Sequence, residues 1–274
     1  MTANKNSARP AGERIAKFLA RAGVASRRDV ERMIAAGRIA VDGAIISTPA
    51  TFVTAASRIT LDGAPVAAAQ STRLWLYHKP RGLVTTARDP QGRPTVFEKL
   101  PKHLPRVISI GRLDRDSEGL LLLTNDGALA RRLELPSSGW PRTYRVRVRG
   151  CPDAAALARL KQGITVRGIH YGPIEARLDE SSATRARAAN SWLTVTLREG
   201  KNREIRRVFQ HLGHSVSRLI RIAFGPFELG ALPPAAVQEV PHESLSAFLG
   251  RGEESENPGK TQSHGGAPRS RRTQ

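Results

Sequence analysis

The chain has 274 residues, one cysteine, and 44 lysine and arginine side chains against 24 aspartates and glutamates, which gives a formal charge of +20. The single cysteine, Cys151, excludes an internal disulfide and a multi-cysteine metal site. No apolar run approaches the roughly 20 residues of a membrane-spanning helix, and the first residues lack the apolar segment of a signal peptide, so we expect a cytoplasmic protein without a membrane partner. The charge excess, most of it between residues 63 and 250, favours a polyanionic partner.

The N-terminal part of the chain predicts a small module between polar segments. Residues 1–12 and 251–274 are polar, rich in small residues and without apolar periodicity, which predicts disorder at both ends. Residues 13–63 predict an α/β module with two helices, the second capped by Ser26, followed by short strands with Asp-Gly turns. The small and polar residues 64–72 predict a linker.

The remainder, residues 73–250, predicts a second domain in which strands and helices do not alternate regularly, so we expect an α+β fold. Strands are expected at 74–79, 143–149, 193–198 and 216–223, and helices at 127–134, 153–161, 202–212 and 242–249. Neither a dinucleotide-binding glycine motif nor a P-loop is present, and the histidines lack the spacing of a metal site. We therefore expect no cofactor and no metal.

The start of the second helix, Ser26-Arg27-Arg28, places two arginines beside free backbone N–H groups, an arrangement that favours phosphate. Lys17 can extend this basic patch, although an ordinary solvated helix pair would have the same pattern. The module resembles the S4 RNA-binding domain over the stretch RIAKFLARAGVASRRDVERMIAAGRIAVDG. The resemblance implies that Arg27 and Arg28 face RNA phosphates. The hairpin that follows the helices argues against a DNA-reading helix-turn-helix, so we expect no DNA partner.

The most informative segment is residues 111–127, GRLDRDSEGLLLLTNDG. Its leucines at 120–123 predict a fully buried strand. The charged loop before them is therefore held against a core, where such loops usually bind or react.

The acids of this loop allow several uses. Asp114, Asp116 and Glu118 have partial calcium-loop spacing, but the last ligand position is Asn125. Two carboxylates of a glycosidase would lie too close together in one loop. A single carboxylate acting on a nucleic-acid base or sugar, beside phosphate-binding arginines, is the third use, and a turn whose acids merely pair with arginines is the fourth.

Residues 111–127 resemble the catalytic motif of the RsuA/RluB family of ribosomal RNA pseudouridine synthases, G-R-L-D followed by S-E-G-L-L-L-L-T-N-D-G. The resemblance implies that Asp114 is the catalytic aspartate, as nucleophile or as base, and that Arg112 takes the place of the flipped nucleotide. It also implies a cofactor-free isomerase in which an S4-like module precedes a domain with a mainly antiparallel sheet and a central cleft.

Further motifs resemble the same family. The K-P-x-G segment that begins at Lys79 would line the RNA cleft. The strand TYRV would place Tyr144 against the flipped base, although a strand tyrosine is more often a packing residue.

The segment REGKNREIRRVFQHLG predicts a helix with Asn202 as its N-cap. By the resemblance, Arg206 forms a salt bridge with Asp114. Arg203 lies on the basic face of the helix, which is either solvated or in contact with RNA, and we expect the RNA contact. Many family members have His-Gln where this chain has Arg203-Glu204. The large-subunit branch of the family matches slightly better than the small-subunit branch.

These observations predict a monomer that acts on ribosomal RNA or a pre-ribosomal particle. The alternative is a non-catalytic S4-domain protein for RNA binding or ribosome assembly, which leaves the acid-rich loop beside the buried leucines unexplained.

Overall fold

The computed structural model describes residues 12–68, 70–179 and 189–255. The predicted disordered ends lie largely outside this part of the chain. The described residues divide into a unit that ends at Glu239 and a C-terminal unit that begins at Val240.

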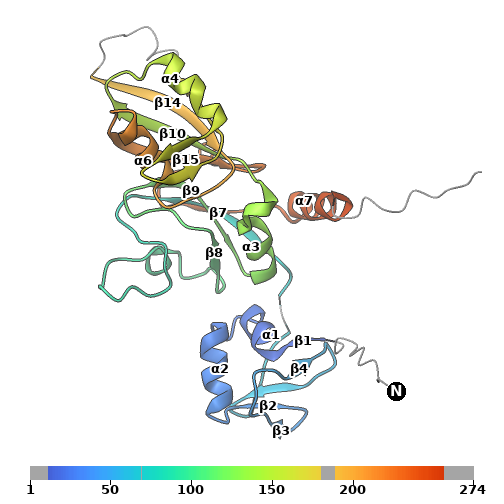
Figure 1. The fold of residues 1–274 in the computed structure, drawn as a ribbon. Coiled ribbons are helices and arrows are strands. Elements are labelled where there is room, and N and C mark those ends of the chain that lie inside the picture. Colours follow the sequence, from blue (N-terminus) through green and yellow to red (C-terminus); the bar gives the residue numbers. More distant parts are fainter. Residues whose placement is uncertain (1–11, 69, 180–188, 256–274) are drawn as a thin grey trace, which may run out of the picture. The chain divides into compact units, whose positions relative to one another are not determined.

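The N-terminal module contains two helices and two small sheets (Figure 1). Ser26 caps the second helix as predicted, because its Oγ accepts the Asp29 N–H at 3.1 Å. The core is built from aliphatic side chains of both helices and of the strands. Its elements are β1 (Glu13–Arg14), α1 (Ile15–Arg21), α2 (Arg27–Ala35), β2 (Ile39–Val41), β3 (Ala44–Ile45), β4 (Phe52–Val53), β5 (Ile59–Leu61) and β6 (Ala64–Pro65).

The sheet of this module has the order β3-β2-β5-β6, with all neighbours antiparallel, and β1 pairs separately with β4. The sheet therefore extends past residue 63, because Ala64 and Pro65 pair with β5. Part of the predicted linker is thus a strand of the module.

The larger domain is built on a mixed sheet in which the described strands follow the order β13-β14-β10-β15-β9-β7-β17, with β16 beside β15 and β8 beside β9 (Figure 1). All neighbours are antiparallel except β9 and β15, which are parallel. The strands are β7 (Leu74–Lys79), β8 (Ile108–Ile110), β9 (Glu118–Thr124), β10 (Arg142–Arg149), β13 (Ile174–Leu178), β14 (Asn190–Leu197), β15 (Val216–Phe224), β16 (Phe227–Glu228) and β17 (Val237–Glu239).

Helices and a separate hairpin, β11 with β12, complete this domain. α3 contacts β8 and β9, α4 contacts β13, and α6 contacts β15 and β11. These elements are η1 (Phe97–Lys99), α3 (Gly127–Glu134), η2 (Pro136–Ser138), α4 (Ala154–Arg159), η3 (Leu160–Gln162), β11 (Ile164–Val166), β12 (Ile169–Tyr171) and α6 (Glu204–His211).

Burial follows the sequence pattern of the strands. In β10 the side chains of Tyr144, Val146 and Val148 are buried, whereas the arginines between them point away from the core. β9 is buried at every position because it is a central strand, with β7 along one edge and β15 followed by β8 along the other. The predicted buried strand at 120–123 is confirmed.

The predicted elements of the larger domain are present. β7 and α3 have the predicted bounds, and the strands expected at 143–149, 193–198 and 216–223 are β10, β14 and β15 with shifted ends. The helix expected at 202–212 begins only at Glu204.

The C-terminal unit contains α7 (His242–Ser255). In its first turn the Leu245 N–H donates to the Pro241 carbonyl. No helix among the described residues is long and apolar enough to cross a membrane.

Candidate active site

A cavity of about 930 Å³ opens in the larger domain. It is bounded by the loop after β7, the loop before β9, the start of β10, the segment that leads into α6, and β15. Among the residues that line it are Thr85, Asp89, Arg112, Asp114, Glu134, Arg142, Tyr144, Glu199, Arg203, Glu204 and Arg221. Four of the predicted site residues, Arg112, Asp114, Tyr144 and Arg203, thus line one cavity.

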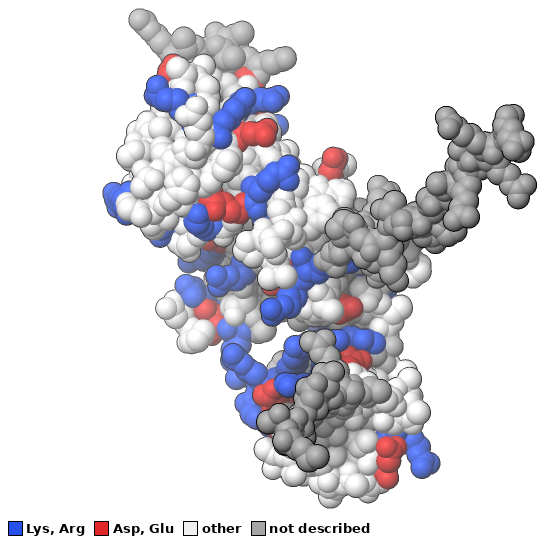
Figure 2. Space-filling view, turned by 45° about the vertical axis from the view of Figure 1, so that its right-hand side comes forward, with Lys and Arg blue, Asp and Glu red and all other residues white. Residues whose placement is uncertain are grey.

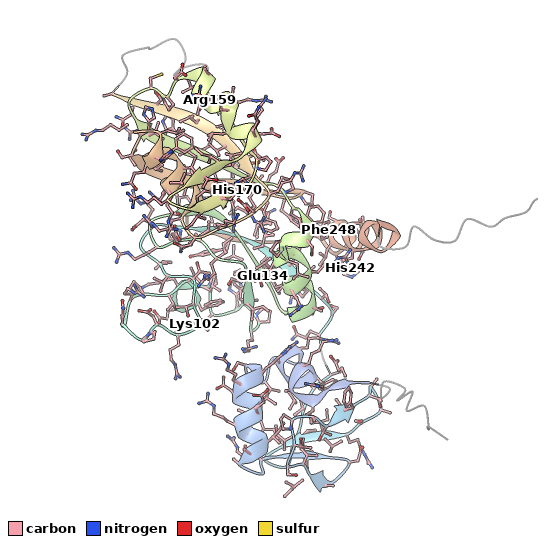
Figure 3. The ribbon with its side chains drawn as sticks, viewed as in Figure 1. Lys102, Glu134, Arg159, His170, His242 and Phe248 are labelled. Atoms are coloured by element: carbon pink, nitrogen blue, oxygen red, sulfur yellow. The ribbon has the colours of Figure 1, made fainter. Side chains whose placement is uncertain are left out.

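The loop of residues 111–117, called here the aspartate loop, is held at several points. At its start the Gly111 N–H donates to Glu134 Oε1 at 2.6 Å, and Glu134 is labelled at the end of α3 in Figure 3. The buried Thr85 hydroxyl donates to the Leu113 carbonyl at 2.9 Å and accepts the Leu113 N–H at 3.3 Å. The backbone next to Asp114 is therefore fixed by side chains from two other segments.

Lys79, the last residue of β7, binds backbone carbonyl groups of the aspartate loop. Its side chain is 0% exposed, and Nζ donates to the carbonyls of Pro80, Asp114 and Ser117 at 3.0, 3.1 and 2.9 Å. Burial lowers the pKa of Lys79 to about 8, against the opposing effect of the loop carboxylates. The predicted RNA contact of Lys79 is contradicted, because a fully buried ammonium group cannot reach a phosphate.

Asp114 is the loop residue whose carboxylate faces the cavity, with 34% of its side chain exposed. Its ion-pair partner is Arg203, with 3.6 Å between Asp114 Oδ2 and Arg203 Nη1. The structure therefore corrects the predicted pairing of Asp114 with Arg206.

Arg206 instead links α6 to the backbone. Its Nη1 donates to the Val216 carbonyl and its Nη2 to the Asp116 carbonyl, both at 3.0 Å. Burial lowers the pKa of Arg206, while the charges of Asp114 and Asp116 oppose this effect at longer range. Arg206 thus positions the aspartate loop, because its Nη1 and Nη2 bind carbonyl groups rather than a carboxylate.

The backbone at the start of α6 explains why Arg203 reaches Asp114. Arg203 is the N-cap residue and has a left-handed conformation, with φ of 52°. The predicted N-cap, Asn202, lies outside the helix, and its Oδ1 accepts a hydrogen bond from Arg207 Nη2 at 3.0 Å. The left-handed turn directs the Arg203 side chain toward the cavity, which helix periodicity could not predict.

The other predicted residues have different settings. Tyr144 is 9% exposed and lines the cavity from β10, whereas Arg112 is exposed at its edge. In the N-terminal module Arg27 and Arg28 are exposed, but Lys17 forms an ion pair with Glu13 at 3.3 Å. Figure 2 shows lysine and arginine side chains over much of the visible surface.

The remaining acids of the motif have structural partners. Glu118 is buried at the start of β9 and pairs with Arg218 Nε at 2.7 Å. Asp116 lies 3.6 Å from Arg115 Nε at the surface. Both acids are thus engaged by arginines of the protein.

Gly119 permits the close approach of β9 and β15. Its φ is +100°, and a Cβ at this position would overlap the Arg221 carbonyl oxygen and lie 2.7 Å from the Arg221 nitrogen. The parallel pairing of β9 with β15 consists of Glu118 with Ile220 and Gly119 with Arg221. The glycine of the motif is needed for this close backbone approach.

A pair of carboxyl groups below Arg203 was missed by the sequence analysis. Glu204 is 3% exposed, and its Oε2 accepts the Lys201 N–H at 2.9 Å. Glu199 accepts the Gly172 N–H at 2.7 Å and forms an ion pair with Lys201, whose Nζ also donates to the carbonyl of His170, labelled in Figure 3. Glu204 Oε1 is buried and receives no hydrogen bond from the described residues.

Burial raises the pKa of Glu204 to about 7, and the negative charge of Glu199 adds to this effect. Burial alone would raise the pKa of Glu199 as well, but hydrogen bonds from Lys201, Gly172 and Glu204 outweigh it and lower that pKa. Burial beside Glu199 therefore favours the neutral form of Glu204 compared with an exposed glutamate. The departure from the family's His-Gln pattern was the sequence signal that could have pointed to this pair.

Two arginines of the cavity were also missed. Arg142, at the start of β10, donates through Nη1 to the carbonyls of Trp140 and Arg198 at 3.2 and 2.7 Å. Arg221, on β15, is 2% exposed and donates through Nε to the Leu120 carbonyl at 2.7 Å. Both arginines resemble outward-facing arginines in the strand pattern, so neither could be predicted as a cavity residue.

Comparisons with known proteins show the family of this chain. The family model described as RNA pseudouridylate synthase matches residues 73–211, and that of the S4 domain matches residues 13–59. An uncharacterized RNA pseudouridine synthase of Rickettsia bellii is 49% identical over 228 residues, 83% of this chain and 96% of its own length. The ribosomal large subunit pseudouridine synthase B of Haemophilus influenzae is 41% identical over 249 residues, 88% of this chain and 68% of its own.

A crystal structure of a pseudouridylate synthase has the same fold, with a TM-score of 0.58 and 24% identity over 85% of this chain and 98% of that one. The expected α+β architecture, an S4-like module followed by a domain with a mostly antiparallel sheet, is confirmed. The fold, the motif around Asp114 and the relatives lead to one conclusion: the chain belongs to the RNA pseudouridine synthase family, as an isomerase with an S4 domain before its synthase domain.

Proposed function

We propose that this enzyme converts a uridine of large-subunit ribosomal RNA to pseudouridine, with Asp114 as the catalytic carboxylate. The 41% identity to a ribosomal large subunit pseudouridine synthase B supports the large-subunit substrate. The formal charge of +20 and the exposed Arg27 and Arg28 of the S4 domain support binding of a long RNA.

The observation that carries the proposal is that Asp114 is the available carboxylate of the cavity. The other carboxyl groups of the described cavity wall are engaged. Asp89 pairs with Arg93, Glu134 accepts the Gly111 N–H, Glu199 pairs with Lys201, and Glu204 is buried, with a pKa that burial raises to about 7. Asp114 has a distant ion-pair partner, is a third exposed, and sits on a fixed backbone.

The reaction requires these features. The uracil must leave the RNA stack to enter the cavity, at a few kcal/mol. The bond between N1 and the ribose C1′ breaks, the uracil turns, and C5 bonds to C1′; C5 then loses its proton and N1 gains one. Asp114 acts on the ribose or the base as nucleophile or as proton acceptor, Tyr144 packs against the uracil, and Arg112 fills the vacated position in the RNA.

The test compares Asp114→Asn with Asp116→Asn on large-subunit ribosomal RNA that carries tritium at C5 of uridine. Release of tritium reports the C5 proton loss. Asp114→Asn should abolish release and leave RNA affinity within a few fold, because it removes a charge but keeps the shape. Asp116→Asn, a surface variant in the same loop, should retain activity. Normal release by Asp114→Asn refutes the catalytic assignment.

The substrate is tested by offering the wild-type enzyme large-subunit and small-subunit ribosomal RNA separately. We expect tritium release from the large-subunit RNA. Release from the small-subunit RNA alone would overturn the substrate assignment and leave that of Asp114 intact. Chemical mapping of pseudouridines in ribosomal RNA from a deletion strain then locates the uridine.

A further inference from the structure

The floor of the cavity contains a buried guanidinium group that no protein acceptor fully satisfies. Arg221 is 98% buried, since only 2% of it is exposed, and of its nitrogens Nε donates to the Leu120 carbonyl. Nη2 is buried and has no hydrogen-bond partner, and Arg221 forms no ion pair among the described residues. A buried charge left in this state is unfavourable, so its retention points to an acceptor that arrives with a ligand.

The surroundings of Arg221 are positively charged. The guanidinium groups of Arg142 and Arg221 lie over the same Phe224 ring, at 4.8 and 5.4 Å from its centroid. Burial lowers the pKa of Arg142, and the charge of Arg221 lowers it further. The Asp114 carboxylate, which lines the same cavity, pairs instead with Arg203.

The position of Arg221 in the sheet places it next to the residue expected to hold the base. Arg221 lies directly opposite Tyr144 in the register of β10 and β15, at the point where a bulge follows Thr143. Both side chains line the same cavity as Asp114. A ligand that packs on Tyr144 therefore has its edge within reach of the Arg221 guanidinium.

Resting on the proposed function, we infer that Arg221 is a further catalytic residue, which donates to a carbonyl oxygen of the flipped uracil and stabilises the negative charge that the base acquires when its glycosidic bond breaks. The uracil oxygens O2 and O4 share this charge once N1 has left C1′. A preorganised donor in a buried site is well suited to such developing charge. Arg221 acts only as a hydrogen-bond donor in this step and transfers no proton.

A phosphate could also accept a hydrogen bond from Arg221. A phosphate of the RNA backbone, however, would have to reach the floor of the cavity to do so. A flipped nucleotide inserts its base while its phosphates stay with the RNA strand. Arg221 is 2% exposed, whereas Arg112 at the cavity edge is exposed. The guanidinium group of Arg221 therefore faces the flipped base, and that of Arg112 faces the RNA strand.

The experiment compares Arg221→Met and Arg221→Lys with Arg147→Met, which removes an exposed arginine of the neighbouring strand β10 that does not line the cavity. Under single-turnover conditions Arg221→Met should reduce the rate about 100-fold, equivalent to about 2.7 kcal/mol. Arg221→Lys should recover part of the rate, and Arg147→Met should match the wild type.

A second measurement separates the base from the phosphate. The variants are titrated with two RNAs that are identical except that one lacks the base at the target position. Arg221→Met should weaken binding of the uridine RNA and leave binding of the abasic RNA unchanged. Equal weakening of both RNAs would assign Arg221 to a phosphate and overturn the inference.

The folding of each variant is checked by its thermal transition. If Arg221→Met does not fold, Arg221→Lys carries the test, because its amine can still donate to the Leu120 carbonyl. A folded Arg221→Lys with wild-type rate and wild-type pH profile would refute the guanidinium role. The proposed function is tested separately. If the wild type is active and Asp114→Asn is inactive, the proposed function holds even when the inference about Arg221 fails.

Discussion

Replacement of Glu204 by glutamine tests the buried carboxyl pair beneath Arg203. Glutamine has nearly the same shape. Its amide oxygen can accept the Lys201 N–H that Glu204 Oε2 accepts at 2.9 Å, and its amide nitrogen can donate to Glu199. The substitution therefore keeps the hydrogen bonds of protonated Glu204 and removes its ability to ionise.

The size of the effect follows from the pKa of Glu204, which rises from 4.5 in an exposed glutamate to about 7 in the folded enzyme. Between these values the folded protein keeps a proton that the unfolded chain has released. The free energy of unfolding of the wild type therefore falls as the pH rises, by about 1.4 kcal/mol per pH unit, and levels off above pH 7. The loss between pH 5 and pH 8 amounts to about 2 kcal/mol.

Urea unfolding of the wild type and of Glu204→Gln at pH 5 and pH 8 measures the pH-dependent contribution of Glu204 to the free energy of unfolding. For each pH we take the free energy of unfolding of Glu204→Gln minus that of the wild type. This difference should be about 2 kcal/mol larger at pH 8 than at pH 5, in favour of the variant. Titration of other groups, such as Lys79, cancels in the difference. Glu175→Gln, which changes an exposed glutamate of β13, should follow the wild type at both pH values. A stability difference between Glu204→Gln and wild type that does not change with pH would refute the reasoning.

Three further outcomes follow from the structure. Gly119→Ala should lower the free energy of unfolding by roughly 3 kcal/mol or more, because Cβ meets the Arg221 backbone and φ is +100°; an unchanged urea midpoint would contradict this. Lys79→Met should destabilise by about 3 kcal/mol and reduce kcat by releasing the carbonyls of the aspartate loop, whereas the exposed Lys102→Met should do neither. Arg27→Ala with Arg28→Ala should raise KM for RNA at unchanged kcat and make the salt dependence of log K shallower by about 2; a higher KM with an unchanged salt slope would exclude phosphate contacts.

The elements of the larger domain were predictable where local pattern and tertiary structure agree. The alternation in β10 and the Asp126 cap of α3, whose side chain accepts the Ala128 N–H at 2.7 Å, locate these elements directly. Asp114 was identified by its motif, and the cavity contains it.

The contacts of the site could not be predicted in the same way. Lys79 is buried because the aspartate loop folds over the end of β7, a long-range packing event with no local signal. Arg203 replaces Arg206 as the partner of Asp114 because one residue adopts a left-handed conformation before α6. Arg221 is buried because the register of β15 shifts at the bulge opposite β10.

The short parallel pairing of β9 with β15 has a consequence for the biosynthesis of the enzyme. Gly119 and Arg221 are adjacent in the sheet, although about a hundred residues of chain separate them, so a large loop must close before they meet. Asp114 precedes this junction and Arg221 belongs to it. A nascent chain therefore cannot complete the cavity that contains Asp114 until β15 has emerged from the ribosome.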